Sequence, residues 1–194
     1  MDKEIINFVR EKLAPTDHVI FIYHDLQEKR EILFIFLKAA LDRDEDAVYI
    51  ASEETPDQIR DAMKNFGLDV EKLEEEGSLK VLNYDGVYLI DGKPDIAHTS
   101  NLWRKIVDEA RKRGRKGVRL TGETACWFEQ GLTEELVEYE KSLHRKFEIP
   151  LIAICAYNFK TLEKARGEVV MDLIRAHGYS IDSRSTPTVT KIYG

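Results

Sequence analysis

Apolar and amphipathic stretches alternate along the chain. Five short apolar runs are bounded by polar residues, which is typical of strands that are covered on both faces. Between them, apolar residues recur every three or four positions, as they do along one side of a helix. The predicted strands are 18–23, 47–51, 78–83, 117–122 and 150–156, and the predicted helices are 26–41, 56–65, 95–113, 133–147 and 162–177. This alternation predicts a three-layer α/β fold with a mostly parallel, doubly wound sheet.

Three segments fall outside this alternation. Residues 1–16 predict an N-terminal helix. In residues 84–94, two Asp-Gly turn signals flank four apolar residues, which indicates a small hairpin or a lid. The segment 181–194 is polar and rich in threonine, and it is either a loose terminus or a short edge strand at 188–193. Since no repeat or low-complexity segment divides the chain, we expect a single domain over residues 1–194.

Composition limits the class of protein. Apolar residues make up 43% of the 194 residues, which suits a folded domain. No apolar run approaches the ~20 residues of a membrane helix, so we expect no membrane partner. The net charge of −7 argues against direct nucleic-acid binding, which needs a basic surface. The N-terminus lacks the apolar stretch of a secretory signal, and we therefore expect a cytoplasmic protein.

The cysteines and histidines do not indicate a metal site. Cys126 and Cys155 lie in different predicted elements, with no CxxC pair and no paired histidine spacing. His18 and His24 have no cysteine or histidine neighbour at metal-ligand spacing. No Ser-His-Asp arrangement can be assigned either. We therefore expect no catalytic residue, no bound metal and no other cofactor.

The segment after the first predicted strand lacks a phosphate-binding loop. A nucleotide hydrolase of this fold class carries GxxxxGK[ST] there, and the backbone amides and lysine of that loop hold phosphate. The sequence here is YHDLQEKREIL, which contains no glycine, and Asp25 and Glu28 have the spacing of a helix-capping pair. A carboxylate therefore occupies the helix terminus where phosphate would bind. We expect no nucleotide hydrolysis, while a nucleotide held in another way stays open.

Candidate binding residues follow from the position of ligands in such sheets, which is beyond the carboxyl ends of the strands. That rule selects residues that follow four of the predicted strands: Tyr23, His24, Glu53, Glu123, Trp127 and Tyr157. Aromatic side chains with one charge pair suit a small, mostly apolar ligand that carries a single polar group.

The fourth predicted strand carries charge on a face that helices would cover. Arg119 and Glu123 share that face, because side chains on a strand alternate. Arg119 therefore has either a buried ion-pair partner or a ligand anion. Glu140, in the predicted helix 133–147, is the partner we expect, and its neighbour Tyr139 has the helical spacing of a core residue.

These positions predict one cavity. Arg119 and Glu123 share a strand face, Trp127 lies four residues after Glu123, and Tyr157 ends the fifth strand. We predict that these four side chains converge at the carboxyl edge of the sheet, with Tyr23 completing the wall.

Several motifs, in the same order, resemble the MEDS family, the sensory domain of methanogens and methylotrophs that is related to the dichloromethane-responsive regulator. They are HVIFIY from His18, DAVYIASEETPDQIRDAMKNFGLDV, GSLKVLNYDGVYLIDGKPD, GVRLTGETACW, LVEYEKSL and ICAYN. The resemblance runs from about residue 17 to residue 177 and implies a degenerate, RecA-like ATPase fold without a functional phosphate loop. It places the marked positions of the family on His18, Tyr23, Gly122, Glu123, Trp127, Tyr139, Glu140 and Tyr157.

The sequence departs from the family pattern at three positions around the predicted cavity. Thr124 replaces a common Met, Ala156 a common Gln, and Asn158 a common Asp. These departures imply a ligand that differs from that of other members.

Three functions remain open at this point. The resemblance favours a non-enzymatic sensory or regulatory domain that binds an unknown small molecule. The alternative is a nucleotide-binding protein of the RecA-like and KaiC-like class with weak or no ATPase activity, and the third is an interaction scaffold. Because the sequence carries no DNA-binding or kinase module, we expect output through a homodimer or a separate signalling or transcription partner. The apolar residues of 84–94 would supply a surface for that contact.

Overall fold

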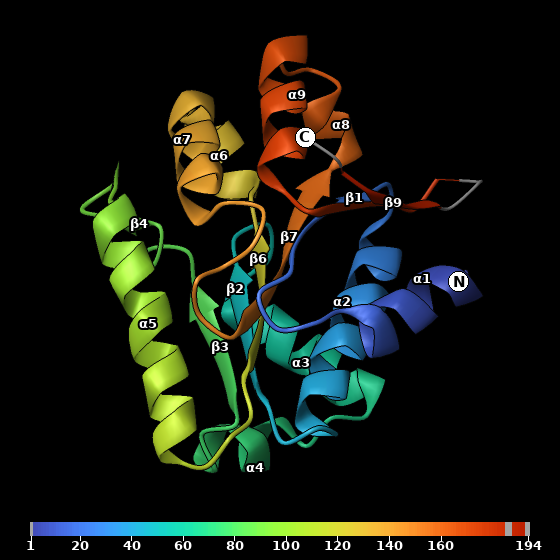
Figure 1. Ribbon diagram of the computed structural model, residues 1–194, viewed down its shortest axis with the longest axis vertical. Helices are drawn as coiled ribbons and strands as arrows, with labels where there is room; N and C mark the ends of the chain where they lie inside the picture. Colours follow the sequence, from blue (N-terminus) through green and yellow to red (C-terminus); the bar gives the residue numbers. More distant parts are fainter. Residues whose placement is uncertain (1, 185–187, 193–194) are drawn as a thin grey trace.

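The computed structural model describes residues 2–184 and 188–192, and these build one central sheet (Figure 1). Its seven strands lie in the order β3-β2-β6-β7-β1-β8-β9, and all neighbours are parallel except β8 and β9. The strands are β1 (His18–Tyr23), β2 (Asp46–Ala51), β3 (Leu79–Asn83), β6 (Val118–Glu123), β7 (Leu151–Asn158), β8 (Tyr179–Asp182) and β9 (Thr188–Lys191). The α/β fold with a mostly parallel sheet is confirmed.

Helices cover both faces of the sheet, as Figure 1 shows. One face, here called the α2 face, packs against α1 (Lys3–Asn7), η1 (Phe8–Lys12), α2 (Leu26–Leu41), α3 (Pro56–Phe66) and α4 (Val70–Glu75). The other, the α7 face, packs against α5 (Ile96–Lys112), α6 (Ala125–Glu129), α7 (Thr133–Leu143), α8 (Phe159–Leu162) and α9 (Gly167–Ala176). The apolar side chains therefore form two cores, one on each side of the sheet.

The start of α2 is set by the cap that the sequence predicts. The Asp25 carboxylate accepts hydrogen bonds from the backbone amides of Gln27 and Glu28, at 2.9 and 3.1 Å. These amides are among the four at a helix start that have no partner within the helix. The first turn of α2 therefore directs satisfied, not free, amides toward the carboxyl edge of the sheet.

The spacing of apolar residues predicted the bounds of two helices incorrectly. α7 ends at Leu143 instead of residue 147, because His144 has a φ of 61° that an α-helix does not accommodate. The predicted helix 162–177 begins earlier and is interrupted, since α8 ends at Leu162 and α9 begins at Gly167. Two further helices, α4 and α6, were not predicted. Each is under two turns long, so its apolar residues do not recur often enough to indicate a helix.

The C-terminal segment contributes two strands. β8 pairs in parallel with β1, although the sequence predicted no strand there and placed its last two residues, Ile181 and Asp182, in the polar tail. β9 pairs antiparallel with β8, so the edge-strand alternative is confirmed for residues 188–191. Residue 193 of the predicted edge strand lies outside the described residues.

The segment 84–94 forms a short hairpin of β4 (Leu89–Ile90) and β5 (Lys93–Pro94) that folds back onto the molecule. Val87, Tyr88 and Leu89 are buried, and the Tyr88 ring packs edge-on against Trp103 of α5. The segment therefore does not supply the exposed apolar surface on which the homodimer prediction rested. The homodimer itself stays a prediction.

No helix among the described residues combines the length and the apolar character needed to cross a membrane.

Gly122 gives a direct test of the packing between β6 and the hairpin. A Cβ atom at this position would overlap the Tyr88 hydroxyl, and the Tyr88 ring is buried and cannot swing away. We expect Gly122→Ala to lower the free energy of unfolding by about 1–3 kcal/mol in urea titrations. Gly167→Ala is the control, because no atom lies within 4 Å of the added Cβ apart from the adjoining residues and the backbone of its own helix. Equal stability of the two variants would contradict the close approach.

Candidate functional site

The residues predicted to form one cavity lie on opposite faces of the sheet. Tyr23 and Glu123 face α2, whereas Trp127 and Tyr157 belong to the core on the α7 face. The register explains the division, because Glu123 pairs with Ala156 and the next residue, Tyr157, points the other way. The prediction of a single cavity is therefore wrong. Binding by the individual residues stays a prediction.

Arg119 lies at the far end of β6 from Glu123. Four residues along a strand separate the two by about 13 Å. The Arg119 guanidinium donates from Nε to Glu45 at 2.7 Å and from Nη1 to the Val9 carbonyl at 2.9 Å, and it lies over the Phe36 ring. The buried ion pair was one of the two expected alternatives, but its partner is Glu45 and not Glu140. Arg119 therefore holds η1 against the sheet.

A compact charged group occupies the carboxyl edge of the α2 face. Lys29, in the first turns of α2, is fully buried, and its Nζ lies 2.5 Å from Glu123 Oε1, 3.0 Å from Glu53 Oε2 and 3.1 Å from Glu54 Oε2. We call these four residues the Lys29 cluster. The three carboxylates of the cluster face two cations, Lys29 and the neighbouring Arg30, which pairs with Glu54.

Glu123 is the best-connected carboxylate of the Lys29 cluster. Besides Lys29, it accepts hydrogen bonds from the Tyr49 hydroxyl and from the backbone amides of Ser52 and Glu53, each at 2.7 Å. The two amide hydrogen bonds fix the loop after β2 around Glu123.

Glu53 links the Lys29 cluster to β1 and β7. It accepts from the Tyr23 hydroxyl at 2.5 Å and from Asn158 Nδ2 at 3.0 Å. Burial, and next the hydrogen bond to Glu53, raise the pKa of Tyr23, so its hydroxyl stays protonated and donates. Burial disfavours the charged forms of both Glu53 and Lys29. The neighbouring donors and Lys29 nevertheless lower the pKa of Glu53, and the carboxylates of Glu123 and Glu53 raise that of Lys29.

Lys29 was missed by the sequence reasoning, although a signal for it exists. In GxxxxGK[ST] the lysine stands six residues after the first glycine. Here Tyr23, Glu28 and Arg30 occupy the positions of the two glycines and the hydroxyl residue, and Lys29 keeps the lysine position. The chain thus keeps the lysine position of the motif although both glycines are absent.

His24 fills the edge of the sheet between β1 and β7. Its ring stacks on Phe159 with centroids 4.3 Å apart, and its Nε2 lies 3.2 Å from Asp182 Oδ1. In a doubly wound sheet, this edge is where the chain leaves a crevice for ligands. Here the stacked pair occupies it, and His24 keeps about a quarter of its side chain exposed.

Aromatic residues on the α7 face form a packed group instead of a cavity wall. The Trp127 ring stacks on Tyr139, with centroids 5.6 Å apart and planes 17° apart, and Tyr88 packs against both. Trp127 is 1% exposed, and its Nε1 makes no hydrogen bond within the described residues. Trp103 Nε1 donates to the Tyr139 hydroxyl at 3.1 Å. Trp127 and Tyr139 are therefore core residues in this structure.

Glu140 is buried beside these aromatic residues, in a polar group of its own. Its Oε1 accepts from the Tyr157 hydroxyl at 2.6 Å, and its Oε2 lies 3.2 Å from His18 Nε2 and 3.5 Å from His177 Nε2. Cys155 completes the group. Burial lowers the pKa of His177 to about 3, so this imidazole is neutral at pH 7. The sequence offered no reason to group residues from four separate elements.

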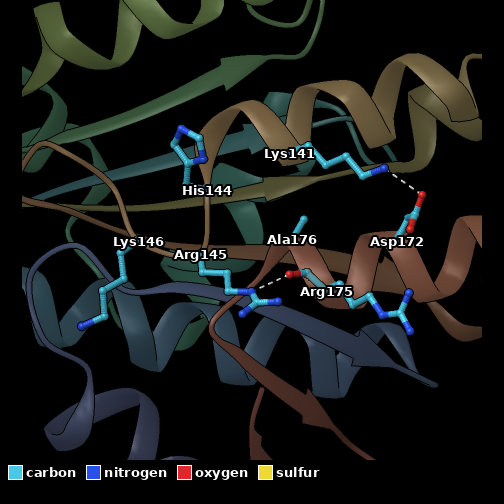
Figure 2. Close-up of a pocket in the computed structure, with 7 residues that line it drawn as sticks. All are labelled: Lys141, His144, Arg145, Lys146, Asp172, Arg175 and Ala176. Carbon is cyan, nitrogen blue, oxygen red and sulfur yellow. Dashed lines mark hydrogen bonds and ion pairs between the residues drawn. The ribbon is translucent and has the colours of Figure 1, made fainter. Parts of the chain in front are cut away.

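Surface grooves lie along the helices of the α7 face, and two of them have volumes above 400 Å³ and are lined by residues from two helical segments. One, of about 420 Å³, runs between the α6–α7 and α8–α9 segments; Phe128, Thr133, Thr161, Lys164 and Val169 are among its lining residues. The other, of about 570 Å³, lies between α7 and α9 and is lined mainly by basic residues (Figure 2). None of the nine residues predicted to bind ligand lines either groove.

Comparisons with known proteins bear on the whole of this arrangement. A family model for the methanogen/methylotroph, DcmR sensory domain, MEDS, matches residues 17–178. A UPF0273 protein from Methanocaldococcus jannaschii is 44% identical over 46 residues, which are 24% of this chain and 19% of the relative. The chain thus matches only about a fifth of that relative's length.

Two solved structures from Pyrococcus horikoshii share the fold. A KaiC-like protein has a TM-score of 0.61 and 22% identity, over 91% of this chain and 76% of its own. A second protein has a TM-score of 0.60 and 13% identity, over 100% of this chain and 94% of its own. At these identities the likeness establishes the RecA-like fold and nothing about activity.

Proposed function

Because this chain belongs to the MEDS family of sensory domains, we propose that it is a regulatory domain that binds a small uncharged molecule and does not hydrolyse nucleotides. Its output passes to a separate partner or to a second copy of the chain. The observation that carries the proposal is the state of the groups that would hold phosphate.

Both kinds of phosphate-binding group are already engaged by carboxylates. The Asp25 side chain accepts from the amides at the start of α2, and the Lys29 ammonium is enclosed by Glu123, Glu53 and Glu54. A nucleotide would have to displace these partners and place its own negative charge beside them. Coulomb repulsion and the loss of buried hydrogen bonds both oppose that exchange.

The groove of about 420 Å³ is the position that we propose for the ligand. Its volume falls in the usual range for small-molecule sites, and it lies where α6 and α8 follow the carboxyl ends of β6 and β7. Phe128 in its wall contacts the Tyr157 ring edge-on, and Tyr157 donates to Glu140. Ligand contact with Phe128 would therefore reach the buried core of the α7 face.

We expect no ATP or GTP turnover from the purified protein. The steady-state measurement is phosphate release at millimolar nucleotide and magnesium, with nucleotide binding followed in parallel by calorimetry. Glu123→Gln is the matched variant, because it keeps the shape of the side chain and removes the charge. Turnover of ~1 s⁻¹ would be at the low end for enzymes. If the wild type shows such turnover and Glu123→Gln abolishes it, the proposal is wrong.

The alternative is nucleotide binding without efficient hydrolysis, and one observation favours it. Lys29 keeps the lysine position of the phosphate loop and contacts an acid at the end of β6. Tight nucleotide binding that weakens at least tenfold in Lys29→Met would support this alternative. A co-purified uncharged molecule in native mass spectra, lost in Phe128→Ala, would support the regulatory domain.

A further inference from the structure

Four potential metal ligands meet on the α7 face, far from one another in sequence. His18 begins β1, Glu140 lies in α7, Cys155 lies in β7, and His177 follows α9. All four are buried, and one donor atom from each lies within 4.8 Å of the other three. The Lys29 cluster, whose ion pairs support the proposed function, lies on the opposite face of the sheet.

The separations between the donor atoms suit a tetrahedral ion. Ligand bonds of ~2.0–2.3 Å at tetrahedral angles place neighbouring donors roughly 3.3–3.8 Å apart. His18 Nε2 lies 3.2 Å from Glu140 Oε2 and 3.4 Å from Cys155 Sγ. Glu140 Oε2 lies 3.5 Å from His177 Nε2 and 3.9 Å from Cys155 Sγ. Small shifts of the side chains would bring all four onto one centre.

The imidazoles are oriented as they are in protein metal sites. His18 Nδ1 donates to the His144 carbonyl at 2.8 Å, and His177 Nδ1 donates to the Leu173 carbonyl at 2.7 Å. These partners hold the two rings so that each Nε2 atom points at the other ligands of the group. Bonds of this kind to the second ring nitrogen are typical of metal-bound histidine.

One buried polar atom of the group has no hydrogen-bond partner among the described residues. His177 Nε2 makes no hydrogen bond within the described part of the chain, although the residue is 0% exposed. A buried polar atom without a partner is rare and calls for an unrecorded ligand or ion. The Tyr157 hydroxyl satisfies only the second oxygen of Glu140.

From this geometry we infer that His18, Glu140, Cys155 and His177 bind a divalent transition-metal ion of the zinc class. Binding releases the thiol proton to solvent. The thiolate, the carboxylate and the doubly charged cation then sum to zero, which suits a buried site. Four protein ligands leave no open coordination position, so the ion ties β1 and β7 to α7 and α9 and has a structural role.

The surface above the site does not favour entry of a metal ion into the folded protein. Lys141 and Ala176 are the chain neighbours of Glu140 and His177, and they line the groove of about 570 Å³ in Figure 2. Arg145, Lys146 and Arg175 also line it, and Lys141 pairs with Asp172. This basic lining repels cations. We therefore expect the metal to be acquired during folding and to exchange slowly afterwards.

Elemental analysis of the protein, expressed without a histidine tag, tests the inference. The expected content is about one zinc per chain in the wild type and less than about a tenth of that in Cys155→Ser. Cys126→Ser is the matched control, because Cys126 is also buried on the α7 face and is outside the group. Unfolding and refolding with cobalt(II) should give a thiolate-to-cobalt absorption band that Cys155→Ser lacks and Cys126→Ser keeps.

His177→Asn is a second variant that tests the site if Cys155→Ser does not fold. The asparagine amide can still donate to the Leu173 carbonyl but cannot replace Nε2 as a ligand. We expect it to fold, as judged by circular dichroism, and to lose at least tenfold in cobalt affinity. A wild type that holds no metal as purified and takes up no cobalt on refolding would overturn the inference. So would equal metal content in the wild type and a folded Cys155→Ser or His177→Asn.

Discussion

Replacing Lys29 with methionine is expected to lower the free energy of unfolding by about 3–5 kcal/mol. The substitution keeps much of the side-chain volume but removes the cation from between Glu123, Glu53 and Glu54. Glu123 is 1% exposed, so its charge would remain buried without its main counter-ion. Guanidinium titrations at pH 7, followed by circular dichroism, measure the loss.

Two further variants show whether the loss comes from the uncompensated charge. Lys38→Met in the same helix is the control, because Lys38 is half exposed and its pair with Asp42 contributes about 0–1 kcal/mol. Combining Lys29→Met with Glu123→Gln should recover part of the stability, since both buried charges are then removed. A loss below about 1 kcal/mol in Lys29→Met would mean that the Lys29 cluster is not coupled as its geometry implies.

Trp127→Ala is expected to cost about 3–5 kcal/mol of unfolding free energy. The ring is buried, stacks on Tyr139 and contacts Tyr88, so its removal leaves a large cavity between α6 and α7. The loss should appear as a lower denaturant midpoint with an unchanged slope. A residue that merely lined a ligand cavity would instead change binding and leave stability nearly intact.

Trp127→Phe separates packing from the indole nitrogen. Phenylalanine keeps a stacked ring and removes the Nε1 donor, which has no partner within the described residues. We expect it to recover more than half of the stability lost in Trp127→Ala, because an unpaired buried donor is itself costly. A stable Trp127→Ala protein would restore the view that Trp127 lines a binding cavity.

The Lys29 cluster and the group formed by His18, Glu140, Cys155 and His177 lie on opposite sides of β6 and β7. Glu123 ends β6 on the α2 face, and Cys155 and Tyr157 lie on β7 on the α7 face. Only the single layer of the sheet separates them, so a shift of the backbone in one group would also move the backbone in the other. The groove proposed for the ligand lies on the α7 face, so any coupling between it and the Lys29 cluster would have to pass through these two strands.

The sequence alone was sufficient to predict the α/β fold class and the positions of the central strands. Buried parallel strands carry continuous apolar runs, and helices carry apolar repeats every three or four residues, so β1, β2, β6 and β7 could be placed within two residues. The cap at Asp25 could also be predicted, because it depends on neighbours two and three residues away. Such features are local, and local sequence determines them.

The tertiary structure alone decided which side chains meet. Glu123 and Tyr157 both end strands, yet a one-residue difference in register sends them to opposite faces. Arg119 found Glu45 instead of Glu140 because the strand carries it to the opposite end of the sheet. His18 and Cys155 come together from positions 137 residues apart. Side-chain partners depend on strand order, register and helix rotation, and these are fixed only when the whole chain packs.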